Sequence, residues 1–399
     1  MANVSSSNGL EKRPKLRFPG FDEPYKQCRI GDIYAERSQR GASDMELLSV
    51  TMNDGVKPRS AIEGKDNSSE DKSNYKIVRK GDMVYNSMRM WQGANGISPC
   101  DGIVSPAYTV LMPKQEINNG YFAALFKSVN LINEFRKNSQ GMTSDTWNLK
   151  YPQIETIKVQ IPSVSEQDKV SELFSVLDER IAAHSQLVES LKKYKRGLVF
   201  HIFRDNNPFG FEMKATPMKD LLHEYRNRDT VNLRVCSVAV NKGVVDQVEH
   251  LGRSFAAADT SNYGRVKPGD VVYTKSPTGC FPYGIVKQNW MDEEVAVSPL
   301  YGVYTPVSKD AGYLLHTYFE QSQNANNYIR TLAQKGAKNT INITTSHFLD
   351  KSILFPSNED CVSHLAKMFD AISAELSLAE KELELLLRQR KTLLQQLFI

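Results

Sequence analysis

The sequence repeats its own pattern of short motifs about 190 residues further along the chain. The paired motifs, first copy then second, are Ser73-Asn74-Tyr75 and Ser261-Asn262-Tyr263, Gly81-Asp82 and Gly269-Asp270, Val84-Tyr85 and Val272-Tyr273, and Ser105-Pro106 and Ser298-Pro299. Solenoid repeats have periods of roughly 20–50 residues, so a period this long does not indicate a solenoid. It predicts two whole domains of one fold, and the differences between the copies become the best guide to function.

Length and composition limit the class of protein. A chain of 399 residues is longer than the roughly 250–300 residues at which single hydrophobic cores stop growing. Hydrophobic residues make up 40% and charged residues 24%, which is typical of a globular protein and not of a disordered one. No apolar run approaches the roughly 18–20 residues of a membrane span, so we expect no membrane partner. The net charge of +4 is compatible with nucleic-acid binding but does not establish it.

Residues 1–14 are polar and charged, and we expect them to form a disordered tail. The chain holds five cysteines, namely Cys28, Cys100, Cys236, Cys280 and Cys361. They form no CxxC pair and no cluster with histidine, so the sequence predicts neither a metal site nor a disulfide framework. A reduced, cytoplasmic setting is the simplest interpretation.

The first part of each copy has the pattern of a mixed α/β domain. Short β-branched and aromatic runs bounded by turn residues, such as 108–112, predict strands. An amphipathic helix is expected to begin near Gly120 in one copy and near Gly312 in the other. We therefore predict domain 1 at residues 15–163 and domain 2 at residues 206–357.

The second part of each copy predicts a long helix, at residues 164–205 and 358–399. Apolar residues recur there at alternating steps of three and four, which is the heptad pattern of a coiled coil. In the first helix the seam is Phe174, Leu177, Ile181, His184, Val188, Leu191, Lys195, Leu198 and Ile202. In the second it is Phe369, Ile372, Leu376, Ala379, Leu383, Leu386, Arg390, Leu393 and Leu397. The cations Lys195 and Arg390 occupy the same seam position, and we expect their charged heads to reach solvent.

Two matching seams predict that the long helices pack against each other; the alternative is that each packs only onto its own domain. One helix lies between the domains and the other follows domain 2, so a pairing that spaces the domains requires antiparallel helices. The predicted fold class is α+β, with two similar mixed α/β domains separated by two long helices that form an antiparallel coiled coil. At about 1.5 Å per residue, each helix would be roughly 55 Å long.

The sequence offers only weak catalytic motifs. Asn207-Pro208-Phe209 is similar to the loop with which adenine methyltransferases hold an amino group, but it lacks that loop's second proline. Asp54 with Glu63-Gly64-Lys65 has the residue types of a metal-dependent nuclease, yet the second copy keeps no such set. The sequence therefore favours a non-catalytic chain without a cofactor. Two alternatives stay open: a self-contained DNA methyltransferase or nuclease, and a coiled-coil adaptor that binds only protein.

The copies preserve a frame and differ in the loops that the frame carries. They diverge over 86–95 and 274–283, and again over 141–145 and 335–339. These loops combine Arg and Lys, which suit guanine edges and phosphates, with smaller polar residues that suit base edges. The candidate DNA-contacting residues are Lys57, Arg59, Arg89, Gln92 and Asn95 in domain 1 and Lys242, Lys275, Thr278, Lys335, Lys338 and Asn339 in domain 2. Similar scaffolds with different tips predict two different half-sites on one ligand.

The chain resembles a known family, the specificity subunits of type I restriction–modification systems. The resemblance rests on the opening segment Leu16-Arg17-Phe18-Pro19-Gly20-Phe21, on Ile30-Gly31-Asp32-Ile33, and on the Gly-Asp-x-Val-Tyr and Ser-Pro-x-Tyr elements of both halves. The order of variable domain, helix, variable domain and helix extends it over nearly the whole chain. One departure is Tyr25, where many relatives carry tryptophan.

The resemblance implies two target-recognition domains, each of which reads one half of a split, asymmetric sequence in double-stranded DNA. It also implies that the paired helices set the gap between the half-sites and dock two modification subunits. Those partners bind S-adenosylmethionine and methylate adenine, and restriction motor–nuclease subunits can join them. Half-sites on one face of duplex DNA lie about one helical turn, roughly 34 Å, apart, and the expected helices are long enough to span that distance.

Overall fold

The computed structural model describes residues 2–3, 13–41, 44–52, 55–66, 68–224, 227–228, 232–253, 259–335 and 341–399, of which 2–3, 334–335 and 341–342 are described by their backbone alone. Two compact units divide the chain. Unit 1 comprises Met1–Ser185 and Lys381–Ile399, and unit 2 comprises Gln186–Glu380. Each unit therefore contains one of the two predicted domains together with a part of both long helices.

Domain 1 surrounds one four-stranded antiparallel sheet with short strands and helices. Its strands are β1 (Ala2–Asn3), β2 (Leu16–Arg17), β3 (Lys26–Arg29), β4 (Tyr34–Glu36), β5 (Leu48–Thr51), β6 (Gly55–Pro58), β7 (Lys76–Val78), β8 (Met83–Asn86), β9 (Asn95–Ile97), β10 (Gly102–Val104), β11 (Tyr108–Pro113) and β12 (Lys158–Ile161). Its helices are α1 (Ile30–Ile33), α2 (Asn119–Leu125), α3 (Val129–Asn138) and α4 (Tyr151–Ile154). The sheet has the order β4-β11-β8-β9, and smaller antiparallel pairings join β5 with β6, β7 with β10, and β3 with β12.

The two faces of this sheet bury different side chains, because successive residues of a strand point to opposite sides. In β8, Val84 faces a small cluster that includes Val56 and Val110. Its neighbours Met83 and Tyr85 face a larger cluster that contains apolar residues of α2 and of both long helices. Helices thus cover one face of the sheet and hairpins cover the other.

Domain 2 repeats the central sheet and the three smaller pairings of domain 1, but the β1–β2 pair has no counterpart among its described strands. Its strands are β13 (Met213–Pro217), β14 (Leu222–Glu224), β15 (Cys236–Ala239), β16 (Gly243–Asp246), β17 (Gly264–Val266), β18 (Val271–Tyr273), β19 (Val286–Gln288), β20 (Val295–Val297), β21 (Gly302–Pro306), β22 (Gln334–Lys335), β23 (Ile341–Asn342) and β24 (Ser352–Pro356). Its helices are α6 (Met218–Leu221), α7 (Gln247–Leu251), α8 (Lys309–Phe319) and α9 (Ser322–Ile329). The central sheet has the order β14-β21-β18-β19, and the pairs β15–β16, β17–β20 and β13–β24 repeat the three smaller pairings. The prediction of two similar mixed α/β domains is confirmed.

The helix that follows the central sheet begins at different points in the two copies. Helix α2 begins beside Gly120, as expected, and the side chain of Asn118 caps its first turn. Helix α8 begins at Lys309, before the expected Gly312, because the side chain of Ser308 caps it there. A capping serine satisfies a backbone N–H that the first helical turn leaves unpaired.

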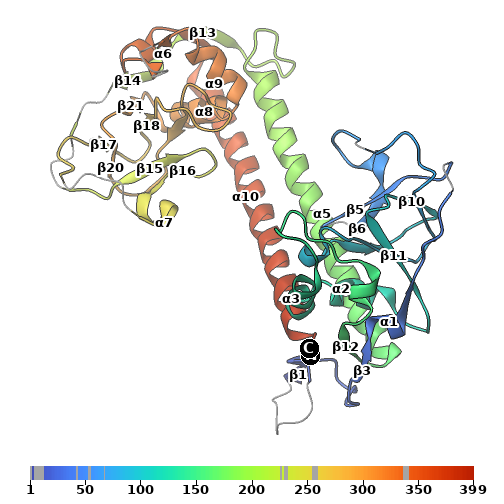
Figure 1. The fold of residues 1–399 in the computed structure, drawn as a ribbon. Helices are drawn as coiled ribbons and strands as arrows, with labels where there is room; N and C mark the ends of the chain where they lie inside the picture. Colours follow the sequence, from blue (N-terminus) through green and yellow to red (C-terminus); the bar gives the residue numbers. More distant parts are fainter. Residues whose placement is uncertain are drawn as a thin grey trace. The chain divides into compact units, whose positions relative to one another are not determined.

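The two long helices, α5 (Val164–Ile202) and α10 (Glu359–Gln396), run side by side (Figure 1). In unit 1, the ring of Phe174 in α5 stacks on Phe398, just beyond α10, with centroids 5.8 Å apart. In unit 2, Lys192 Nζ of α5 lies 3.0 Å from Glu380 Oε1 of α10. Within unit 1, Arg390 of α10 also pairs with Asp178 of α5, so residue numbers rise along α5 as they fall along α10. This confirms the predicted antiparallel pairing.

The predicted coiled-coil seam is confirmed as well. Every seam residue is buried or half-buried, whereas most residues between seam positions are exposed. The most buried members include Phe174, Val188, Leu198, Phe369 and Leu397. The alternative, in which each helix packs only onto its own domain, is therefore wrong.

The seam cations depart from the expectation that their heads reach solvent. Lys195 Nζ lies 2.6 Å from Glu320 Oε2 in unit 2, and the lysine side chain is only 13% exposed. Arg390 donates hydrogen bonds to both carboxylate oxygens of Asp178 in unit 1. A largely buried cation loses most of its hydration, so a carboxylate in each unit takes the place of water.

The segment expected to be a disordered tail is described only in part. Residues 4–12 lie outside the described residues, whereas Ala2–Asn3 form β1, which pairs with β2. The compact units also do not end where the predicted domains end, because each helix is shared between units.

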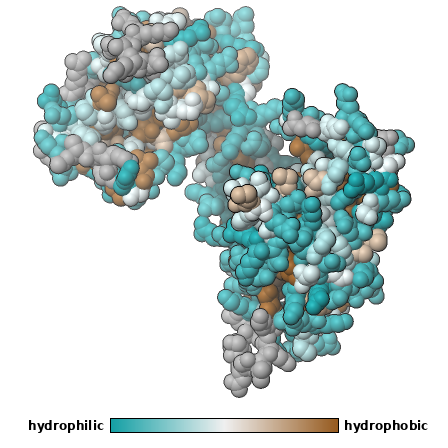
Figure 2. Space-filling view, in the orientation of Figure 1, coloured by the Kyte–Doolittle hydropathy of each residue, from teal (hydrophilic) through white to brown (hydrophobic). Residues whose placement is uncertain are grey.

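The visible surface is mostly hydrophilic, and apolar residues form small separate patches in the view of Figure 2. Such scattered apolar residues are ordinary for a protein surface. Within the described ranges, no helix has the length and apolar character needed to cross a membrane. The same part of the chain holds no group of three or more His, Cys, Asp or Glu side chains suited to a metal ion.

Candidate nucleic-acid interface

The loop after β8 in domain 1 presents Arg89 to solvent. The side chain of Asn86 accepts a hydrogen bond from the backbone N–H of Met88 at 3.0 Å, which starts a tight turn. A short 3₁₀ helix, Met90–Gln92, follows, and Met90 is fully buried beneath it. With Met90 as the anchor, Met88 (40% exposed) and Arg89 face outward.

A second loop, residues 139–148, follows α3 and is closed at its base. Gln140 and Asn148 exchange two backbone hydrogen bonds, of 3.0 and 2.8 Å. Inside the loop, the N–H of Thr146 donates to the carbonyl of Thr143 at 2.9 Å. Gly141 lies so close to Thr146 that an added Cβ would sit 2.6 Å from its carbonyl oxygen. The loop is therefore ordered although it is exposed.

Aromatic and backbone contacts join these two loops into one surface. The rings of Trp91 and Trp147 meet edge to face with centroids 5.2 Å apart. The guanidinium of Arg136 lies over the ring of Trp91 at 5.4 Å. The backbone N–H of Leu149 donates to the carbonyl of Ser87 at 2.9 Å. A change in the position of one loop must therefore shift the other.

The corresponding loop of domain 2, after β18, is held in another way. Thr278 and Phe281 exchange two backbone hydrogen bonds, and Phe281 is buried at 3% exposure. Lys275 adopts a positive φ of 57°, and a Cβ on Gly284 would lie 2.8 Å from its nitrogen. Glycine is thus required at position 284, where φ is +98°. The exposed tip of this loop carries Thr278.

The predicted DNA-contacting residues of domain 1 occupy very different environments. Arg89 is exposed, and Gln92 and Lys57 are half-buried, the last on β6. The guanidinium of Arg59 donates to three backbone carbonyls, of residues 62, 64 and 65, so it holds its own loop together. Asn95 has no exposed surface, so in this conformation it cannot touch a base.

The predicted residues of domain 2 are only partly described. Lys242 is exposed in the turn between β15 and β16, and Thr278 is exposed beside the half-buried Lys275. Lys335 lies on β22, where only the backbone is described. Lys338 and Asn339 lie outside the described residues. The structure brings Lys275 and Thr278 into one loop and leaves Lys242 on a separate hairpin.

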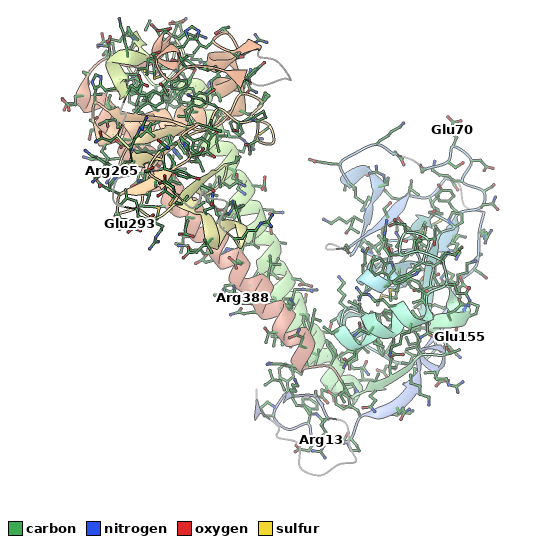
Figure 3. All side chains as sticks on the ribbon, turned by 60° about the vertical axis from the view of Figure 1, so that its left-hand side comes forward. Arg13, Glu70, Glu155, Arg265, Glu293 and Arg388 are labelled. Atoms are coloured by element: carbon green, nitrogen blue, oxygen red, sulfur yellow. The ribbon has the colours of Figure 1, made fainter. Side chains whose placement is uncertain are left out.

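Other surface arginines of domain 2 form ion pairs with neighbouring glutamates. Arg265 Nε of β17 donates to Glu294 Oε2 at 2.7 Å, and Arg234 Nε lies 3.3 Å from Glu293 Oε1. Arg265 and Glu293 are labelled in Figure 3. Cations that are already paired are poorer candidates for phosphate contacts, because binding would first have to break the pair.

A largely buried polar cluster of Lys195, Lys287, His316 and Glu320 ties domain 2 to α5. Glu320 accepts from Lys195, and its other oxygen lies 3.1 Å from His316 Nε2 and 3.6 Å from Lys287 Nζ. His316 Nδ1 accepts the backbone N–H of Gln288 at 3.1 Å, so Nε2 carries the proton of the neutral ring. Burial lowers the pKa of His316 and of Lys287. Burial also acts to raise the pKa of Glu320, but the hydrogen bond from His316 and the two lysine charges outweigh it and hold that pKa well below its usual range.

Domain 1 is tied to α5 by the segment that opens the sequence. Arg17 donates two hydrogen bonds to Glu166, of 2.9 and 2.8 Å, and both side chains are buried. Tyr25 donates to the same carboxylate at 3.3 Å, and Arg17 lies over its ring at 5.0 Å. Tyrosine therefore serves at position 25 as both a stacking surface and a hydrogen-bond donor.

The sequence analysis missed two features: the Trp91–Trp147 ring pair and the polar cluster around Glu320. The duplication did carry a signal for Arg136, because the second copy has Arg330 at the matching place. Neither Trp91 nor Trp147 has such a match, and His316 is one of seven scattered histidines. Their roles depend on contacts between segments that lie far apart in the sequence.

Comparison with known proteins assigns the first half of the chain. The model of the family described as "Type I restriction modification DNA specificity domain" matches residues 23–193, which span most of domain 1 and of α5. Residues 23–193 are therefore similar to this class of DNA specificity domains. The resemblance to the specificity subunits of type I restriction–modification systems, inferred from the opening motif and the duplicated elements, is confirmed. No curated protein matches the chain significantly in sequence.

Solved structures share the fold over almost the full chain. The S subunit of a type I restriction–modification system from M. genitalium matches with a TM-score of 0.60 at 13% identity, over 97% of this chain and 99% of that one. A structure described as "Structural basis underlying complex assembly and conformational transition of the type I R-M system" matches with a TM-score of 0.50 at 13% identity, over 96% and 99%. The HsdS subunit from Thermoanaerobacter tengcongensis gives 0.43 at 13% identity, over 96% and 97%. At this identity, the first two matches show a common fold.

Proposed function

We propose that this chain is the DNA-reading specificity subunit of a type I restriction–modification complex and is not itself catalytic. Each domain would read one half of a bipartite, asymmetric site in double-stranded DNA. The observation that carries the proposal is the duplication itself, in which the same strand order holds different loops. Loops held in unlike ways on matching frames suit two different sequences on one duplex.

In this proposal the helix pair serves as a spacer and as the docking surface for two modification subunits. Those subunits would supply S-adenosylmethionine and adenine methylation, and restriction motor–nuclease subunits would join in the cytoplasm. The continuous α5 of 39 residues supports the spacer role, since at about 1.5 Å per residue it is roughly 58 Å long. That length exceeds the roughly 34 Å between half-sites one turn apart.

The decisive experiment is to map methyl-adenine in the genome of a host with this gene intact and deleted. We expect one split, non-palindromic motif to lose methylation when the gene is deleted. An unchanged methylome, with the modification subunits present, would overturn the proposal.

A second experiment tests the spacer. Inserting one heptad at matched positions of α5 and α10 is expected to change the gap between the half-sites while both half-site sequences stay the same. Half-site sequences that changed with helix length would contradict the spacer role. Crosslinking of labelled S-adenosylmethionine to the purified chain is expected to give no signal, and a specific signal would favour a self-contained methyltransferase.

A further inference from the structure

The loop at residues 140–147 differs in chemistry from the rest of the candidate surface. It contains no lysine or arginine, and it carries three hydroxyl side chains, one carboxylate at Asp145 and one thioether at Met142. Met142 is 99% exposed, the largest exposure of any large apolar side chain in the described part of the chain. A carboxylate is repelled by phosphate, so this loop is poorly suited to the DNA backbone.

Cations stand around the loop instead of within it. Arg89, Arg136 and Lys150 are all exposed, one on the neighbouring loop and two on the flanks of the loop itself. Lysine and arginine side chains bind phosphates and fix the register of a protein on the duplex. With phosphate contacts at its edges, the loop between them would face the base edges.

The residues of the loop suit base edges. An aspartate accepts a hydrogen bond from the amino group of cytosine, hydroxyls bind several bases, and apolar groups contact the methyl group of thymine in the major groove. Methionine is unbranched and polarisable, and it is common on surfaces that bind by apolar contact. A single exposed apolar residue would need no explanation, but this one lies at the tip of an ordered loop that is joined to Arg89.

We infer that loop 140–147 is the base-reading element of domain 1 and that Met142 contacts a thymine methyl group in the major groove. Trp147, which meets the ring of Trp91 edge to face, is the positioning residue that holds the loop at the depth required. The inference rests on the proposed function and adds a reading element that was absent from the residues predicted for domain 1.

The first test repeats the methylome with variant chains. Met142→Ala is expected to relax the motif at one position of one half-site and leave the other half unchanged, whereas Met142→Leu keeps most of the preference. Val129→Ala, which shortens another exposed apolar side chain of domain 1 (47% exposed), is the control and is expected to change nothing. If the wild-type chain directs no split motif, the proposed function fails. If it does and Met142→Ala leaves the motif unchanged, only this inference fails.

The second test uses duplexes that carry the split motif, with each thymine in turn replaced by deoxyuridine, which lacks the methyl group. The complex of the chain with its modification subunits is expected to bind one such duplex about fourfold more weakly, which corresponds to about 0.8 kcal/mol for one buried methyl group. The Met142→Ala complex should bind the thymine and uracil duplexes equally. A wild-type complex that is indifferent to every replacement would overturn the inference.

The positioning role has its own readout. Trp147→Ala is expected to relax several positions of the half-site that Met142→Ala affects, because the whole loop shifts, whereas Trp147→Phe should restore the motif. Unfolding of both variants at the same temperature as the wild-type chain would show that domain 1 still folds. A Trp147→Ala chain that folds and methylates the wild-type motif at the wild-type level would contradict the positioning role.

Discussion

Domain 1 and domain 2 share a strand order but differ in what fills the space beneath the sheet. In the register of the central sheets, Gly96 of β9 takes the place of Lys287 in β19, opposite Val84 and Val272. Counted from Gly120 and Gly312, the alanine at 124 and the serine at 128 take the places of His316 and Glu320. Domain 2 therefore holds a buried charge cluster where domain 1 has a glycine and small side chains.

The difference teaches that the frame does not require a particular interior. In domain 1, Gly96 allows β9 to approach Gly55 so closely that an added Cβ would lie 2.6 Å from its Cα. In domain 2, Lys287 occupies the matching register position, and its ammonium is joined through Glu320 to Lys195 of α5. Adding a methyl group at position 96 should therefore destabilise domain 1, whereas removing the Glu320 carboxylate should destabilise domain 2.

The largest expected effect comes from Glu320→Ala. It would leave Lys287 and Lys195 buried without their carboxylate, so we expect unit 2 to lose about 3 kcal/mol of unfolding free energy. Domain 2 has a single tryptophan, Trp290. Urea unfolding followed by its fluorescence, with Trp91 and Trp147 replaced by Phe, measures the loss. Glu293→Gln, which removes an exposed pair with Arg234 in domain 2, is the control and should cost less than about 1 kcal/mol. Equal losses would show that the cluster is not special.

Gly96→Ala should act on domain 1 alone. The added methyl group would lie 2.6 Å from Gly55 Cα and 2.8 Å from Val56 N, and such overpacking costs about 2 kcal/mol. Gly197→Ala is the matched control, because nothing lies within 4 Å of its added Cβ. In the α5 helix that change should stabilise the protein by up to about 1 kcal/mol. Urea unfolding followed by the fluorescence of Trp91 and Trp147 measures the loss for Gly96→Ala in unit 1, and that of Trp290 measures the gain for Gly197→Ala in unit 2. A neutral Gly96→Ala would refute the close-approach argument.

Arg89→Ala should weaken recognition of the half-site that domain 1 reads and leave recognition of the other half-site unchanged. If Arg89 reads a base, its loss should cost about 1–3 kcal/mol of binding and relax one half-site only. Binding to duplexes with single changes in each half-site would measure this. An equal loss on all sequences, with a smaller salt dependence, would identify a phosphate contact. Lys275→Ala is the counterpart in domain 2 and should affect the other half-site.

The smallest expected effect is a pH dependence confined to unit 2. The pKa of His316 is lowered by burial, so below about pH 6.5 the unfolded chain takes up a proton that the folded chain excludes. Stability that is present above that pH should fall as the pH drops, by up to about 1.4 kcal/mol per pH unit. Glu320 also has a lowered pKa, but its contribution is lost only below its ordinary value of 4.5.

Domain 1 supplies the internal control, since residues 15–163 contain no histidine. Urea unfolding between pH 7 and pH 5 should therefore weaken domain 2 and leave domain 1 almost unchanged. His316→Gln should flatten the slope for domain 2 whatever its effect at pH 7. Parallel slopes in the two domains would exclude His316 as the cause.

The duplication made the large features predictable. Two matching seams indicated the antiparallel helix pair because a stripe such as Phe174, Leu177 and Ile181 must be buried against something of the same length. The turn and strand signals around Gly81 and Gly269 likewise indicated the repeated sheet. These features depend on local pattern and repetition, which a single sequence contains.

Contacts between distant segments were not predictable. Asn95 lies in a divergent loop region of the sequence, yet β9 carries it into the core. Arginine is a residue type that commonly binds phosphate, but the guanidinium of Arg59 donates to backbone carbonyls of its own loop. Whether a polar side chain faces solvent or a neighbouring residue depends on which distant segments of the chain pack against it. The periodicity of the sequence does not contain that information.

The end of α10 lies in the core of domain 1, where Leu394, Leu397 and Phe398 belong to the same cluster as Phe174. A ribosome makes residues 15–163 long before it makes this segment. Domain 1 must therefore emerge with a gap in its interior, which closes only after domain 2 and both helices have been synthesised. Premature termination that removed just this short stretch would damage the half of the molecule that is translated first.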